Sequence, residues 1–132
     1  MKTGPRLLTY VPFMRRIHVL LGAAAVALVA TSAATPMTLP KLRGTVGPGF
    51  TISLKRGLVP VKQLKAGKYT FVVSDKAAIH SFQIEGPGGL DRAITTVGFV
   101  GTKTVTLLLK RGTYKFYCVP HESTMHGSFK VT

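Results

Sequence analysis

From residue 50 to residue 132, short segments of alternating apolar and polar residues follow one another, separated by glycine, proline and lysine-glycine turns. Valine, isoleucine, threonine, phenylalanine and tyrosine are frequent in these segments, and they favour strands. No stretch after residue 35 keeps a helical period for three turns. The pattern therefore predicts an all-β fold, a β-sandwich. The expected strands are 50–55, 68–74, 80–85, 102–110, 113–118 and 128–132.

The first third of the chain has a different composition. It begins with four basic residues and no acidic one: Lys2, Arg6, Arg15 and Arg16. Residues 17–30 are then nearly all apolar, and the small residues of TSAATP follow. This order is typical of a secretory signal peptide. We therefore expect residues 1–34 to be a signal peptide, cleaved after Ala33 or Ala34, and residues 35–132 to form one domain.

The apolar run at 17–30 has two other interpretations. A buried core helix would show a polar face, which this run lacks. A membrane anchor needs roughly 20 strongly apolar residues, whereas this run is shorter, rich in alanine and interrupted by His18. A cleaved signal is therefore favoured, and an uncleaved anchor remains open. The sequence predicts an exported protein (periplasmic, at the cell surface or extracellular) of bacterial origin.

The charge balance of the chain is strongly basic. The formal net charge is +14, and removal of residues 1–34 takes away four cations and no acid, which leaves about +10. Such a charge attracts acidic proteins or anionic surfaces, although it also serves solubility alone. The lysines are scattered, and neither a basic helix nor an aromatic RNA-binding motif occurs, so no nucleic-acid partner is expected.

Cys118 is the only cysteine in the chain, so it cannot form an internal disulfide. Small exported domains use cysteines in pairs, and this thiol is therefore expected to be shielded or bound. Side chains alternate between the two faces of a strand. With Lys115 facing water, Cys118 points inward, and by the same argument His80 shares the inner face with Phe82. Parity in the last strand, extended across a loop, places Met125 inside and His126 outside.

Each of these residues taken singly has a simpler explanation, because buried cysteine, methionine and bonded histidine are ordinary core residues. Their combination is more specific. Cys118, His121 and Met125 occupy one short segment, and His80 comes from a separate strand. Two imidazoles, a thiolate and a thioether are the ligands of a blue-copper site. Thiolate and thioether favour Cu(I) and imidazole accepts Cu(II), so such a site passes single electrons.

Residues 47–132 resemble the cupredoxins, the small blue-copper proteins. The segment GTYKFYCVPHESTMHGSFKV is similar to the copper loop of that family, and AAIHSF is similar to the segment that supplies its first histidine. The resemblance implies a Greek-key β-sandwich that holds one copper ion. It also implies the ligands His80, Cys118, His121 and Met125. A plastocyanin-like spacing would put methionine at the position of His126, whereas parity and the glycine that follows favour Met125.

The resemblance further implies a monomeric electron carrier. Electrons would pass along the His121 edge, ringed by apolar residues such as Val119 and Pro120, to redox partners with acidic docking surfaces. A copper carrier outside the cytoplasm is the alternative, and a neighbouring His126 supports it. A metal-free interaction module is a third interpretation. An enzyme with a Cys118 nucleophile is not expected, because His121 lies too close in a tight loop to leave a substrate cleft.

Overall fold

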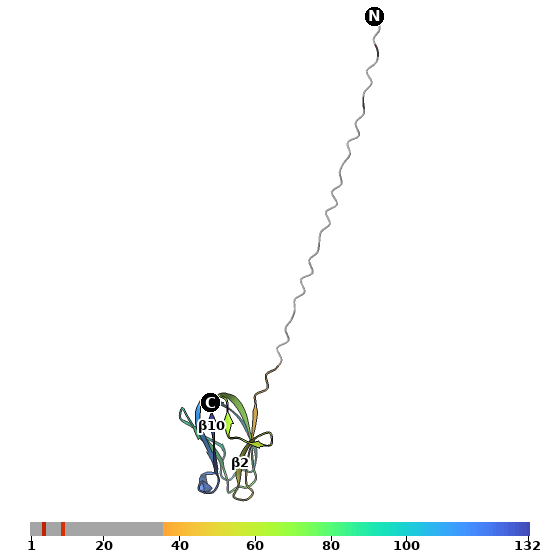
Figure 1. Ribbon diagram of the computed structural model, residues 1–132. Coiled ribbons are helices and arrows are strands. Elements are labelled where there is room, and N and C mark those ends of the chain that lie inside the picture. The colour runs from red at the N-terminus through yellow and green to blue at the C-terminus, as the bar shows by residue number, and fades with distance from the viewer. Residues whose placement is uncertain (1–3, 5–8, 10–35) are drawn as a thin grey trace. The chain divides into compact units, whose positions relative to one another are not determined.

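The computed structural model describes residues 36–132 and two isolated positions, Gly4 and Thr9 (Figure 1). The predicted signal peptide at 1–34 therefore lies outside the described residues, apart from those two positions. Residues Pro36–Thr132 form one compact unit. Within the described part of the chain, no helix is long and apolar enough to cross a membrane.

Two five-stranded sheets make up this unit. The first sheet has the order β3 (Val59–Pro60), β2 (Ile52–Arg56), β1 (Lys41–Val46), β5 (Gly67–Asp75), β8 (Gly101–Leu109). The second has the order β4 (Gln63–Leu64), β10 (His126–Val131), β9 (Gly112–Tyr117), β6 (Phe82–Gly86), β7 (Leu90–Thr95). The pairs β1–β5 and β4–β10 are parallel, and the others are antiparallel. The chain crosses between the sheets after β3, β4, β5, β7 and β8, which confirms the all-β sandwich.

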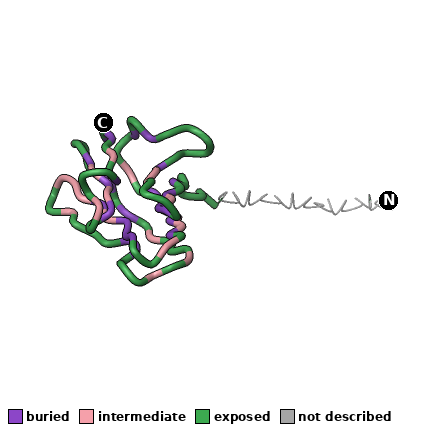
Figure 2. Tube along the Cα trace, turned by 90° about the horizontal axis from the view of Figure 1, so that it is seen from below, coloured by how far each residue is buried: buried purple, intermediate pink, exposed green. Residues whose placement is uncertain are grey.

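The core lies between the two sheets, where the inward residues of all strands but the two-residue β3 meet (Figure 2). In β5 burial alternates, with Tyr69, Phe71 and Val73 inside. Aromatic rings fill the second sheet's side, and the rings of Phe82 and Phe116 stack with centroids 5.7 Å apart. This alternation is the pattern from which the sandwich was predicted.

All six predicted strands are present, with shifted ends. The segment expected at 80–85 begins as a strand only at Phe82, so His80 lies in the preceding loop. Four further strands, β1, β3, β4 and β7, were not expected. β1 was missed because Gly44 interrupts it, yet a Cβ at Gly44 would lie only 2.9 Å from Val73 Cγ2. Glycine is thus required there for close packing against β5.

The strands give the sandwich two distinct ends. β1, β5 and β9 all finish at one end, where four loops gather: 47–51, 76–81, 96–100 and 118–125. We call this the loop end. At the opposite end β1 begins and β10 reaches the C-terminus, and we call this the terminal end (Figure 1). The loop end collects every residue proposed from the sequence as a copper ligand.

Candidate metal centre

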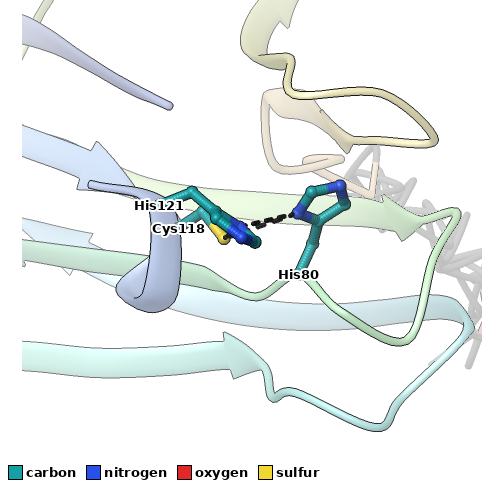
Figure 3. Close-up of side chains that lie close together, drawn as sticks. All are labelled: His80, Cys118 and His121. Carbon is teal, nitrogen blue, oxygen red and sulfur yellow. Dashed lines mark hydrogen bonds between the residues drawn. The ribbon is translucent and has the colours of Figure 1, made fainter. Parts of the chain in front are cut away.

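Three of the predicted ligands converge at the loop end. His80 Nδ1 lies 3.2 Å from His121 Nδ1, while Cys118 Sγ lies 3.8 Å from His80 Nδ1 and 3.5 Å from His121 Nδ1. Figure 3 shows the three side chains pointing toward one another. His80 and Cys118 are fully buried, whereas His121 is partly exposed. Residues that are 38 and 41 positions apart in sequence thus form one cluster.

The size of this cluster fits a metal ion. The point equidistant from the three donor atoms lies about 2.0 Å from each of them, and metal–imidazole bonds measure roughly 2.0–2.1 Å. The donor set also fits copper, since soft thiolate and borderline imidazole suit its two oxidation states. Without a metal ion to bind, the three donor atoms would be polar groups held close together in a buried setting, which is unfavourable.

The orientation of His80 follows from its second ring nitrogen. His80 Nε2 lies 3.3 Å from the carbonyl oxygen of Pro48, so Nε2 carries the proton and donates to that carbonyl. Nδ1 is then left with its lone pair facing the cluster. The 47–51 loop can approach this closely because Gly47 has φ +71° and a Cβ there would lie 2.8 Å from His80 Cδ2.

The segment after β9 is folded by its own backbone. Cys118 N–H donates to the carbonyl of Met125 at 2.9 Å, and Met125 N–H donates to the carbonyl of His121 at 2.8 Å. Between them runs the single-turn 3₁₀ helix η1 (Val119–His121). Met125 is completely buried, whereas His126 is exposed with its Nδ1 2.8 Å from the carbonyl of Glu122. Strand parity predicted this inside–outside pair correctly.

Ser81 connects the two loops that hold the donors. Its backbone N–H donates to Cys118 Sγ at 3.4 Å, and its hydroxyl oxygen accepts from Val119 N–H at 2.9 Å. The side-chain bond fixes the start of η1 against the loop of His80.

Phe50 covers the imidazoles from the 47–51 loop. Its ring lies edge-on to His121 at a centroid distance of 4.9 Å and to His80 at 5.7 Å. The ring is itself 59% exposed, so it forms part of the surface. Other exposed apolar side chains of the four loops are Ile79, Val97, Val100 and Val119. The surface around the cluster is therefore apolar.

Ionisable groups next to the cluster lie on the outer face of the second sheet. Lys115 forms ion pairs with Glu85, at 3.9 Å, and with Glu122. The hydrogen bond to Glu122 raises the pKa of Lys115, with partial desolvation opposing it. Burial, followed by the nearby acids Glu85, Asp91 and Glu122, raises the pKa of Tyr117. Three of the four acids of the chain therefore gather on this one face.

Two contacts of the site could not be found from residue types. The carbonyl of Pro48 is a backbone group and leaves no signal in the sequence. The second is the buried Asp75, which accepts from Thr95 Oγ1 at 2.7 Å and from Ala77 N–H at 3.3 Å, at the base of the His80 loop. Asp75 does follow the inward parity of Tyr69 and Val73, so strand alternation was a usable signal for it.

The fold and the cluster are those of a copper-binding protein, and comparison with known proteins gives the same class. The model of copper-binding proteins of the plastocyanin/azurin family matches residues 62–132. The chain therefore belongs to that family, and the cluster of His80, Cys118 and His121 fits one type 1 copper ion. No match is found among curated proteins.

Among solved structures, the chain is similar to rusticyanin. Rusticyanin from Thiobacillus ferrooxidans is 22% identical, with a TM-score of 0.47, over 70% of this chain and 76% of that one. A structure of reduced rusticyanin is 24% identical, with the same TM-score, over 70% of this chain and 78% of that one.

Proposed function

We propose that this protein is an exported carrier of single electrons whose copper ligands are His80, Cys118, His121 and Met125. The observation that supports it most is the convergence of two imidazole nitrogens and one thiolate sulfur within hydrogen-bonding distance of one another. Bound copper would supply a one-electron couple between Cu(I) and Cu(II).

Some of the proposed ligands would hold the copper ion in place, and one of them would also conduct the electron to a partner. Cys118 and His80 are buried and fixed by Ser81 and Pro48, so they hold the donor geometry in both redox states. Small rearrangement between states is what makes electron exchange fast. His121 is partly exposed beneath Phe50, and its ring edge would be the shortest route to a partner.

A redox partner would dock at the loop end. The exposed side chains there are mainly apolar, so contact with a partner would desolvate the His121 edge and shorten the electron path. We propose that long-range attraction by the positive charge of the domain brings an acidic partner close before this contact forms. Export fits the lone thiol, since a copper-bound thiolate is protected from oxidation.

The alternative of a copper carrier is less well supported. A carrier needs exchangeable ligands at the surface, but Cys118, His80 and Met125 are each fully buried. His126, the residue that favoured this alternative, is turned away and bonded to Glu122. Met37, although 95% exposed, lies near the start of β1 at the terminal end.

The test is the visible absorption spectrum of residues 35–132 loaded with Cu(II). An intense thiolate-to-copper band should appear, bleach with a mild reductant and return with an oxidant. The Cys118→Ser variant should bind copper without that band. Weakly bound, freely exchanging copper and no band in the unmodified domain would overturn the electron-carrier proposal and leave the copper carrier or the metal-free module.

A further inference from the structure

The outer face of the first sheet carries cations and no acidic residue. Strand register and burial place the side chains of Lys41, Arg43, Lys55 and Lys68 on this face. Lys41 and Lys68 lie toward its terminal end, and Arg43 and Lys55 lie near its middle. Among the described residues the only ion pairs are those of Lys115 on the other sheet. The four cations of this face therefore have no acidic partner within the domain.

Two of these cations stand directly opposite each other. Arg43 of β1 and Lys55 of β2 are cross-strand partners, and both are exposed. Like charges at directly opposed positions destabilise a sheet. An acid at either position would remove this repulsion, yet three of the four acids lie elsewhere, near Lys115 and Tyr117, and the fourth is buried. The arrangement is stabilised when an anionic surface covers it.

Exposed apolar side chains are interleaved with the same cations. Leu108 is the cross-strand partner of Lys68 and is 58% exposed. Leu39 lies two residues before the start of β1 and is 41% exposed. Leu58 forms the tip of the β2–β3 hairpin, beside a Gly57 with φ +62°, and is 92% exposed. The hairpin thus presents an aliphatic side chain at its most protruding point, next to Lys55.

We propose that this surface, formed by Leu39, Lys41, Arg43, Lys55, Leu58, Lys68 and Leu108, docks on an anionic lipid bilayer. We call it the basic-apolar surface. Cations near a negatively charged leaflet each strengthen attachment, and exposed leucines insert at the boundary between headgroups and acyl chains. An acidic protein would be served by the cations alone, so the leucines favour a lipid surface as the occupant.

Docking in this way sets the orientation of the domain. β5 runs from Lys68, on the basic-apolar surface, to Asp75 at the loop end. Seven residues of strand span about 23 Å at roughly 3.3 Å per residue. The metal cluster lies at that loop end, outside the basic-apolar surface, so docking leaves Phe50 and His121 uncovered. The proposal concerns a surface separate from the metal centre and does not depend on the proposed electron transfer.

The first experiment measures co-sedimentation of residues 35–132 with vesicles. Residues 36–132 form a compact unit with its own hydrophobic core, so we expect them to fold without the preceding segment. Binding is expected to vesicles of equal parts phosphatidylglycerol and phosphatidylcholine, to fall with added salt, and to be absent with phosphatidylcholine alone. Equal binding to both kinds of vesicle, or to neither, would overturn the proposal.

Charge variants locate the surface. Each cation removed should weaken binding about fivefold, so Arg43→Gln with Lys55→Gln is expected to lose about 25-fold. The matched control is Lys76→Gln with Lys103→Gln, which removes the same charge near the loop end and should lose much less. Loss of the Arg43–Lys55 repulsion should leave the domain at least as stable, so weaker binding cannot be attributed to unfolding. Equal losses in both variants would overturn the assignment.

A fluorescence experiment tests insertion and orientation together. The chain has no tryptophan, so Leu58→Trp places a single reporter at the hairpin tip, and Val97→Trp places one at the loop end. The emission of the first should shift to the blue with phosphatidylglycerol vesicles, and the second should not shift. A shift only in the second would reverse the orientation. Binding to soluble polyglutamate as tight as to vesicles, with neither emission shifted, would identify an acidic protein as the occupant.

Discussion

Asp75 and Thr95 are joined by a 2.7 Å hydrogen bond between two fully buried side chains. Asp75 ends β5 in the first sheet and Thr95 ends β7 in the second, so this bond connects the two sheets at the loop end. The same carboxylate accepts from Ala77 N–H at the start of the loop that carries His80. A buried carboxylate thus anchors the loop of one proposed copper ligand.

Thr95→Val should therefore destabilise the domain. Valine has nearly the same shape as threonine but leaves the buried carboxylate without its hydroxyl donor. A hydrogen bond to a charged group contributes about 1.5–3 kcal/mol, and the free energy of unfolding measured in urea should fall by about that amount. The neighbouring Thr96 is exposed, so Thr96→Val should change it by less than about 0.5 kcal/mol. Equal effects of the two substitutions would contradict the role given to Asp75.

Ser81→Ala tests the link between the two loops. Val119 N–H would lose its acceptor, while the backbone donor to Cys118 Sγ would remain. We expect a loss of about 1 kcal/mol in unfolding free energy and faster release of copper to a chelator. The control is Ser123→Ala, at an exposed position of the same segment. A variant that keeps copper as long as the control would show that the Ser81 hydroxyl does not steady the copper loop.

Met125→Leu distinguishes the two candidates for the fourth ligand. The volumes are similar, so stability should change by less than about 1.5 kcal/mol. Leucine has no donor atom, and Cu(II) needs donation more than Cu(I), so the reduction potential should rise. His126→Ala should leave the potential unchanged, because His126 faces solvent. A redox titration of both variants decides the matter, and a shift only in the His126 variant would exchange the assignments.

Phe50→Ala should expose the imidazoles. Because the ring is more than half exposed, its removal should change stability little, but His80 and His121 would lose the aromatic cover that lies against them. Copper transfer to an external chelator should become faster, as measured by decay of the visible band. Leu58→Ala removes an apolar group that is even more exposed, at the other end, and should leave the rate unchanged. Similar rates of copper transfer in both variants would show that Phe50 does not shield the imidazoles.

The strands that could be predicted from the sequence are those in which apolar and polar residues alternate. β5 and β9 have clear alternation, and the inward position of Cys118, directly after β9, was predicted correctly. β1 was missed because Gly44 interrupts it, and β7 was missed because the charged residues Asp91 and Arg92 are typical of a loop. These segments are extended because they pair with neighbouring strands that are distant in sequence.

The site was predictable to the extent that its chemistry is carried by side chains. Cys118, His121 and Met125 are rare residue types at short spacing, and parity placed Met125 and His126 on the correct sides. The Pro48 carbonyl and the position of Phe50 could not be predicted, since both depend on how the 47–51 loop folds over a histidine 32 positions away. Backbone groups and loop conformations are set by tertiary packing, which residue types do not encode locally.

The distance along the chain between His80 and Cys118 has one more consequence. With the proposed ligands, a bound ion would tie together two positions 38 residues apart. In the unfolded chain, closing a loop of that length by a covalent bridge is equivalent to roughly 4 kcal/mol of lost chain entropy. Small exported domains usually obtain such a staple from two cysteines. Here a metal ion bound by one thiolate and two imidazoles would provide the cross-link, so binding the metal would stabilise the folded domain and losing it would destabilise the domain.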